Sequence, residues 1–161
     1  MAEVVQRSEE IDTGFYLLAR LGGSEGDHVL ARSTMASGLF IPLHRHDDIE
    51  CLHIMTGSLD VYRGDQDRWF TLRAGDSIVM PPDVPHAIRN VTDVGADTLA
   101  IMTVRLAAFV RELGAIAAAV GRERTREERM QSLRALADRY GYWLASPAES
   151  EAIRHLPAAV V

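Results

Sequence analysis

The stretch that decides the fold is GLFIPLHRHDDIECLHIMTG, which runs from Gly38 to Gly57. Side chains two residues apart on a β-strand point to the same side, so His44 and His46 present two imidazoles to one face. After a short aspartate-containing turn, Glu50 begins a second strand whose same-parity neighbours are apolar, as inward residues should be. The stretch therefore predicts two imidazoles and one carboxylate that face a common interior.

A fourth candidate lies in a second segment, GDSIVMPPDVPHAIRN, which runs from Gly75 to Asn90. His86 follows a turn that prolines restrict and stands at the start of a strand. His53 has the opposite parity to Glu50, so we do not expect it to be a ligand. Three neutral imidazoles and one carboxylate suit a divalent transition metal, namely iron, manganese, nickel, copper or zinc, and are too rich in nitrogen for calcium or magnesium. We therefore predict one bound metal ion, whose identity the sequence leaves open.

Short β segments cut by glycine, proline and aspartate extend on both sides of these histidines, from Thr13 to about Arg105. No stretch of this region shows the period of a helix. Strands so short and so regularly interrupted predict an all-β core, built as an antiparallel sandwich or a closed barrel. The expected strand segments are GFYLLA, DHVLARSTM, LFIPLH, IECLHIM, SLDVY, RWFTLR, DSIVMP, HAIRNV and TLAIMTV.

The pattern changes to a helical period after Arg105. Apolar residues recur at helical spacing from Leu106 to Val120, and Gly114 is expected to split this helix. The resulting apolar face predicts a helical extension that packs on the barrel. The expected divisions of the chain are an N-terminal arm (1–12), the barrel (13–105) and the C-terminal helical extension (106–161).

Two capping boxes predict the starts of two further helices. Thr125 precedes Glu128 by three residues, and Ser146 precedes Glu149 by three, which is the spacing at which the two side chains cap each other's backbone. Gly141 is placed to stop the first of these helices, because glycine readily adopts the left-handed conformation of a helix end.

Charge and composition exclude several classes of function. The formal net charge of −6 and a pI near 5.5 argue against nucleic acid as a partner, because phosphate binding needs a concentrated basic face. All 17 basic residues are arginine, which excludes mechanisms that need a lysine amine.

The longest weakly polar run, from Leu113 to Val120, is too short to cross a membrane. Cys51 is the single cysteine, and the first residues lack the order of a secretion signal, so we expect a cytoplasmic protein.

Together, the two histidine segments resemble the motifs of the cupin family, whose fold is a double-stranded β-helix or jelly-roll barrel. The positions that match the first cupin motif are Gly38, His44, His46, Glu50 and Gly57. Those that match the second motif are Gly75, Pro81, His86 and Asn90. Asp83 departs from the second motif, where the family usually has glycine. Aspartate tolerates left-handed turn geometry better than most residues, so the departure leaves the ligand set intact.

The resemblance implies a cupin barrel over roughly residues 13–105, with His44, His46, Glu50 and His86 as the metal ligands. The short spacing between the motifs and the helices after the barrel look like the small quercetin-dioxygenase-like cupins. This likeness implies a metal-dependent dioxygenase that acts on a small aromatic or enolic molecule. Glu50 would then serve both as a metal ligand and as the catalytic base.

Two other classes of function fit the same motifs. One is a non-redox cyclase, isomerase or lyase, in which the metal polarises a carbonyl as a Lewis acid. The other is a binding protein that uses the metal to hold a small ligand. In each case the parity of the strands suggests which apolar residues line the pocket: Phe40, Leu52, Ile54, Ile88 and Met102.

We also expect a homodimer. Cupin barrels commonly associate through barrel strands, and the first two strand segments, GFYLLA and DHVLARSTM, offer apolar residues on both parities. If these segments lie at the edge of a sheet, their unpaired backbone groups can form hydrogen bonds with a strand of a second chain.

Overall fold

The computed structural model describes residues 14–22, 27–119 and 125–160 of the 161-residue chain. Each strand segment expected between Thr13 and Arg105 forms a strand, which confirms the all-β core. The strands are β1 (Phe15–Leu21), β2 (His28–Met35), β3 (Phe40–Arg45), β4 (Glu50–Thr56), β5 (Ser58–Arg63), β6 (Arg68–Arg73), β7 (Ser77–Met80), β8 (His86–Arg89) and β9 (Ala96–Thr103). The N-terminal arm expected at 1–12 lies outside the described residues.

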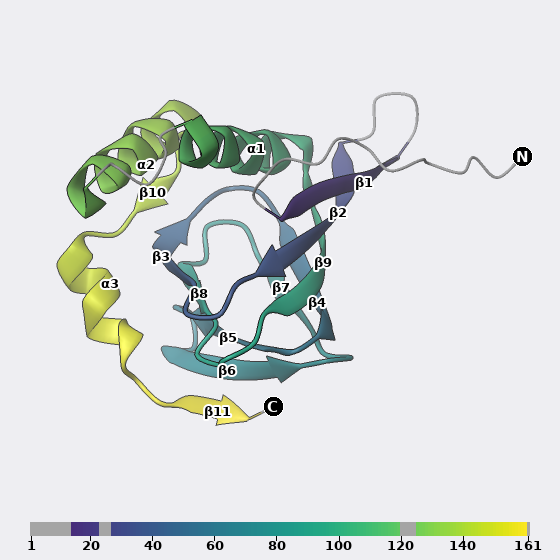
Figure 1. The fold of residues 1–161 in the computed structure, drawn as a ribbon, viewed down its shortest axis with the longest axis vertical. Coiled ribbons are helices and arrows are strands. Elements are labelled where there is room, and N and C mark those ends of the chain that lie inside the picture. The colour runs from purple at the N-terminus through teal and green to yellow at the C-terminus, as the bar shows by residue number, and fades with distance from the viewer. Residues whose placement is uncertain (1–13, 23–26, 120–124, 161) are drawn as a thin grey trace, which may run out of the picture.

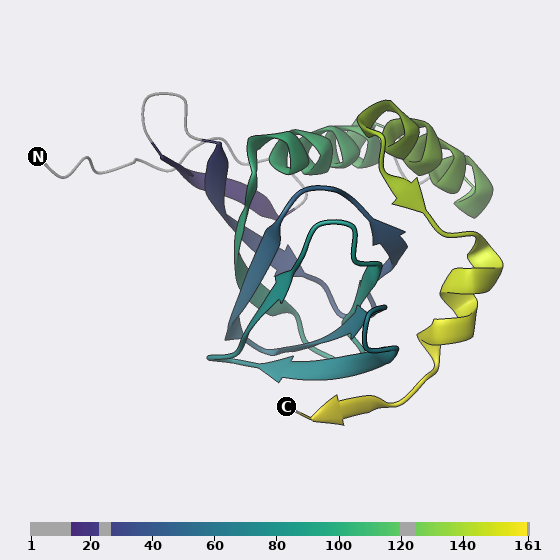
Figure 2. The same ribbon diagram turned by 180° about the vertical axis from the view of Figure 1, so that it is seen from behind.

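The strands form two sheets that enclose the interior of a barrel (Figures 1 and 2). The strand order is β1-β2-β9-β4-β7 in the first sheet and β10-β3-β8-β5-β6-β11 in the second. The chain crosses between the sheets, so strands that are distant in sequence pair side by side, as β4 does with β9 and β3 with β8. This topology places the first histidine segment beside the second.

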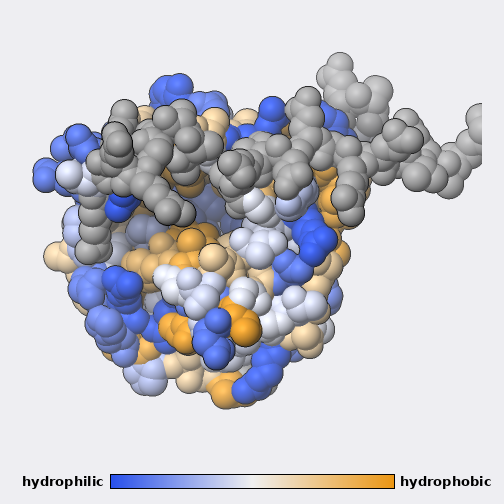
Figure 3. All heavy atoms as spheres, viewed as in Figure 1, coloured by the Kyte–Doolittle hydropathy of each residue, from blue (hydrophilic) through white to orange (hydrophobic). Residues whose placement is uncertain are grey.

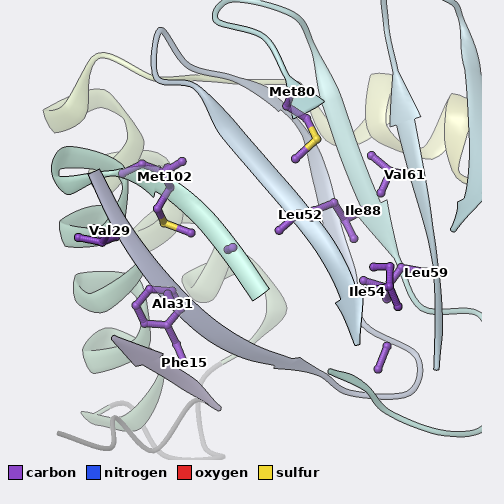
Figure 4. Close-up of a cluster of buried hydrophobic side chains, with 14 of the residues drawn as sticks. Phe15, Val29, Ala31, Leu52, Ile54, Leu59, Val61, Met80, Ile88 and Met102 are labelled. Carbon is purple, nitrogen blue, oxygen red and sulfur yellow. The ribbon is translucent and has the colours of Figure 1, made fainter. Parts of the chain in front are cut away.

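Apolar side chains from both sheets fill much of the interior (Figure 4). The alternation of a strand explains which residues take part. On β4, Leu52 and Ile54 are at most 1% exposed, whereas Cys51 and His53 face the other side and are half-buried. Burial raises the pKa of the Cys51 thiol, which keeps it protonated and unreactive at neutral pH.

The C-terminal extension contains three helices, α1 (Val104–Ala119), α2 (Arg126–Tyr140) and α3 (Pro147–Arg154). Both expected capping boxes form, at the starts of α2 and α3, and α2 ends at Gly141 with a φ of 72°. In Figure 1, α1 and α2 lie together across one side of the barrel, and α3 follows further along it. No helix among the described residues is long and apolar enough to cross a membrane.

The expectation that Gly114 splits the first helix is wrong, since α1 runs through it without interruption. One glycine costs a helix about 1 kcal/mol relative to alanine. Burial of α1 side chains such as Leu106 and Ala107, each 4% exposed, outweighs that cost. Gly114 is itself buried and borders the internal cavity described below.

The extension also adds two strands that the sequence patterns did not predict. β10 (Trp143–Leu144) pairs antiparallel with β3, and β11 (Ala158–Val160) pairs parallel with β6. The two added strands cover both edges of the second sheet. β1 remains an edge of the first sheet, and the homodimer expected there stays a prediction that light scattering would test.

A buried cluster fastens the end of the extension to the second sheet, and we call it the C-terminal clamp: Asp60, Trp69, Arg89 and the backbone of Ile153–Leu156. The Arg89 guanidinium donates to Asp60 at 2.9 Å, to the carbonyl oxygen of Arg154 and to that of Leu156 at 3.1 Å. The guanidinium also lies over the Trp69 ring, 4.2 Å from its centre. Trp69 Nε1 donates to the carbonyl oxygen of Ile153 at 2.7 Å.

Candidate metal centre and its cavity

Three histidines converge at one place inside the barrel. His44 lies on β3 and pairs in register with His86, which begins β8. His46 follows the end of β3 by one residue. Each of the three offers a ring nitrogen, and these atoms all lie within 4.8 Å of one another. The structure thus brings together the three imidazoles that the sequence singled out, in a group that could hold a metal ion.

Backbone carbonyls orient all three rings in the same way. The Nδ1 atoms of His44, His46 and His86 lie 2.8 to 2.9 Å from carbonyl oxygens two residues away in the chain. A carbonyl oxygen only accepts, so each Nδ1 carries the proton and each Nε2 keeps its lone pair. The Nε2 atoms of His46 and His86 are buried without any hydrogen-bond partner. Such unpaired acceptors are costly, and a metal ion is the partner whose chemistry fits them.

The surroundings also hold two of the rings in the neutral form. Burial, reinforced by the nearby His86, lowers the pKa of His44 well below its ordinary value of 6.5. Burial lowers the pKa of His86 as well. His46 differs, because the Glu50 carboxylate and the carbonyl of Asp48 outweigh its burial and raise its pKa. A metal must displace a proton more often from His46 than from the other two.

Glu50, the expected fourth ligand, begins β4 beside the histidines. Its Oε2 atom lies 3.6 Å from Nε2 of His46 and 3.8 Å from Nε2 of His86. It lies outside the group of three whose ligand atoms are all within 4.8 Å of one another. The carboxylate is therefore close enough to share a metal with two of the rings, while its role as a ligand remains a proposal.

Asp83 adopts the turn geometry that its place in the second motif requires. Its φ is 59°, in the left-handed region that glycine and, less often, aspartate adopt. Its backbone N–H donates to the carbonyl oxygen of His46 at 2.7 Å. The turn before His86 therefore holds the loop that carries His46. By contrast, His53 bonds to Ser77 on the outer side of β4, away from this group.

A set of residues that no sequence pattern indicates fixes the loop between His46 and Glu50. We call it the ligand-loop clamp: Asp48, Thr103, Arg105 and Tyr142. Asp48 is 6% exposed. Its carboxylate accepts from the hydroxyls of Thr103 and Tyr142, each at 2.5 Å, and its backbone oxygen accepts from Nδ1 of His46. The Arg105 guanidinium lies 3.7 Å from the same carboxylate.

Tyr142 connects this clamp to the C-terminal extension. Its ring packs against that of His46, with 5.4 Å between the ring centres, and against Phe109 of α1. Burial and the Asp48 carboxylate raise the pKa of its hydroxyl far above the ordinary value, so it remains a donor. No local pattern marks Tyr142, because it is 94 residues from Asp48 in the chain.

A cavity of about 410 Å³ opens from the histidines into the barrel. Strands β1 to β4, β8 and β9 supply its walls together with α1, and the lining is apolar apart from His44, His46, Glu50 and two hydroxyl residues on β2. Figure 3 shows apolar side chains gathered in a hollow of the visible face, below the grey atoms. The three-histidine group therefore borders a cavity whose walls are mostly apolar.

Three of the five residues expected to line the pocket do so, namely Leu52, Ile88 and Met102. Phe40 instead borders a second cavity of about 220 Å³ beneath α1 and α2. A register shift between Ile41 and His44 disturbs the alternation of β3, and Ile41 faces the main cavity in place of Phe40. Ile54 does point inward, but it is packed in the solid core, where it is 0% exposed.

Comparison with known proteins agrees with this architecture. Residues 31–102 match the family model for the cupin domain. The polyketide cyclase RemF from Streptomyces resistomycificus has a similar structure, with a TM-score of 0.51, 19% identity, and coverage of 64% of this chain and 79% of that one. No curated protein matches the chain in sequence.

Two further solved structures resemble the chain at a lower level. A cupin 2 conserved barrel domain protein from Salinispora arenicola has a TM-score of 0.48 and 21% identity, over 58% of this chain and 79% of that one. The DMSP lyase DddQ from Ruegeria pomeroyi has a TM-score of 0.46 and 21% identity, over 62% and 56%.

The fold and the histidine centre thus define a cupin barrel with a candidate metal site. Residues 31–102 match the cupin domain, as the two motifs suggested.

Proposed function

We propose that the chain is a metal-dependent enzyme that acts on a small, largely apolar molecule, and that its reaction is a dioxygenation. The observation that carries this proposal is the pair of buried, unpartnered Nε2 atoms of His46 and His86, beside an apolar cavity that His46 borders. His44, His46, His86 and Glu50 would hold the metal. A redox-active metal there would supply a Lewis acid and a route for electrons between substrate and oxygen.

The chain's own residues would prepare the substrate. The apolar walls of the cavity displace water, which strengthens electrostatic interactions at the histidines. Glu50 would take the proton from an enolic or hydroxyketone oxygen, since it is the carboxylate among the described residues of the lining. Because Oε2 is the Glu50 oxygen that faces His46 and His86 and would bind the metal, the proton would be held at the other carboxylate oxygen, Oε1.

The first test is metal content. Elemental analysis of the purified protein should find a redox-active metal near one per chain, and His86→Ala should lose it on dialysis, because no neighbour supplies a replacement nitrogen. His53→Ala is the matched control, since His53 lies on the outer face of β4, and it should keep its metal. Full occupancy in His86→Ala would remove that residue from the site.

The second test decides the reaction. Oxygen uptake with a panel of flavonols, diketones and catechols should occur in the metal-loaded protein and stop in His86→Ala. Zinc in the purified protein, with turnover but without uptake, would contradict the dioxygenase and identify a cyclase, isomerase or lyase. Tight binding without any turnover would identify a binding protein.

The third test isolates Glu50. Glu50→Gln keeps an oxygen and almost the same volume but loses the charge and the basicity. Metal affinity should fall modestly, while kcat should fall by about 100-fold or more if proton abstraction is the lost step. Wild-type turnover in a metal-loaded Glu50→Gln protein would show that the base lies elsewhere.

A further inference from the structure

We propose that the cavity selects elongated, uncharged molecules, and that the Ser33 hydroxyl binds a polar group at the end of the ligand remote from the histidines. This inference rests on the proposed function, because it assumes a ligand anchored at the metal centre. It adds three properties that the centre alone does not give, namely the charge of the ligand, its length and a polar group at its remote end.

The charge follows from the lining. None of the described residues that border the cavity is an arginine, and the sequence has no lysine. The ionisable groups in the lining are His44, His46 and Glu50, which gather at one place. A carboxylate or phosphate further along the cavity would lose its water without gaining a cation, which is strongly unfavourable. The walls therefore favour an uncharged ligand body.

The length follows from the register of the first sheet. Glu50 on β4 pairs with Met102 on β9, which pairs with Val29 on β2. Ser33 lies four residues beyond Val29 on the same strand, and a strand rises about 3.3 Å per residue. The cavity thus extends about 13 Å along the strands, from the row of Glu50 to that of Ser33, which suits two or three fused or linked rings.

Ser33 provides a polar group at the end of the cavity that is remote from the histidines. It lines the cavity, and no other described residue forms a hydrogen bond with its hydroxyl. Its neighbour Thr34 also borders the cavity, but the Thr34 hydroxyl already donates to Asp97 at 2.7 Å. The backbone oxygen of Ser33 accepts from Thr98, so the strand that presents the hydroxyl is held in place. The free hydroxyl can donate to, or accept from, one ligand group.

Ala100 keeps the middle of the cavity open. It lies on β9 between Ala31 of β2 and Leu52 of β4, and it borders the cavity between the Glu50 row and the Ser33 row. A larger side chain at this position would shorten the space without touching the histidines. Ala100→Leu is therefore a test of length that leaves the metal centre in place.

The experiment measures binding of four probes to the nickel-loaded protein by their absorbance change on coordination. Maltol is a short chelator, 3-hydroxyflavone is an elongated one, and the other two carry either a hydroxyl or a carboxylate at the 4′ position of 3-hydroxyflavone. We expect the 4′-hydroxyl probe to bind about 3- to 10-fold more tightly than 3-hydroxyflavone, as one hydrogen bond provides. The 4′-carboxylate probe should bind at least about 100-fold more weakly than 3-hydroxyflavone.

Two variants, Ser33→Ala and Ala100→Leu, test which residues cause these differences in affinity. Ser33→Ala should remove the advantage of the 4′-hydroxyl and leave maltol unchanged. Ser37→Ala is the matched control, because its exposed hydroxyl donates to the carbonyl oxygen of Thr92 outside the cavity lining, and it should keep the advantage. Ala100→Leu should weaken all three flavones and spare maltol.

Failure of the selectivity proposed for the cavity can be distinguished from failure of the metal centre. Equal affinity for the carboxylate and hydroxyl probes, or an unchanged 4′-hydroxyl advantage in Ser33→Ala, would overturn this inference while maltol binding still supports the metal centre. Failure of all four probes, maltol included, would overturn the metal centre and this inference with it.

Discussion

Two clamps hold the C-terminal extension to the barrel, and they use the same chemistry in different places. In each, a buried aspartate meets an arginine and an aromatic side chain: Asp48 with Arg105 and Tyr142, and Asp60 with Arg89 and Trp69. The ligand-loop clamp contacts His46 directly, through the Asp48 backbone and the Tyr142 ring. The C-terminal clamp contacts strands β5, β6 and β8 and the end of α3.

Although the two clamps contain similar bonds, we expect their loss to affect different properties, namely stability in one case and metal affinity as well as stability in the other. Breaking the C-terminal clamp should lower stability alone, because its members reach no metal ligand. Breaking the ligand-loop clamp should also lower metal affinity, because a ligand that is no longer held pays an ordering cost on binding.

The largest effect is expected in the C-terminal clamp. Arg89→Leu leaves the buried Asp60 carboxylate without its cation and two backbone carbonyls without their donor. The free energy of unfolding should fall by about 3 to 5 kcal/mol in urea titrations, as for other broken buried ion pairs. Metal content per folded chain should stay unchanged. Arg68→Leu, at an exposed arginine that lies over Phe70, is the control and should cost far less.

The next largest effect should separate the two clamps. Asp48→Asn weakens the acceptor of two hydroxyls beside His46 and should lower metal affinity by about 10- to 100-fold. Asp60→Asn makes the same chemical change in the other clamp and should lower stability with metal affinity intact. Competition with a chromophoric chelator measures both affinities. Equal losses of affinity in the two variants would contradict the distinction.

These clamps also mark where prediction from the sequence ends. The histidines, Glu50 and the turn at Asp83 could be predicted, because short motifs and strand parity fix them locally. Tyr142 could not, since its contact with Asp48 depends on how the extension folds back. Parity identifies inward residues but not their depth, so it could not separate Ile54 in the core from Leu52 at the cavity. It also fails at Phe40, where the shift in β3 changes the face.

A smaller effect is expected for Tyr142→Phe. The ring beside His46 remains, but Asp48 loses one of its hydroxyl donors. Stability should fall by about 1.5 kcal/mol, the lower end of the range for one hydrogen bond to a charged group. Metal affinity should fall by less than about tenfold, below the loss in Asp48→Asn. Tyr140→Phe is the control, since its hydroxyl donates to the part-exposed Glu112, and its metal affinity should not change.

The smallest effect concerns Asp47, which pairs with Arg105 at 2.5 Å on the exposed side of the ligand-loop clamp. The hydrogen bond from Arg105 lowers the pKa of the Asp47 carboxyl below its ordinary value of 3.8. A lowered pKa stabilises the folded state above the ordinary value, and the gain is lost as pH falls through the lowered one. Asp47→Asn should cost at most about 1 kcal/mol at pH 7. In unfolding experiments well below pH 3.8, the variant and the parent should converge.

The position of Tyr142 in the chain has a consequence for biosynthesis. During translation His44, His46 and His86 leave the ribosome well before the residue that packs over His46. Domains generally fold from the N-terminal side as they emerge, so the strands can assemble first. If the histidine group binds its metal at that stage, it does so through a loop that Tyr142 does not yet hold, and synthesis of the last segment then encloses the bound ion.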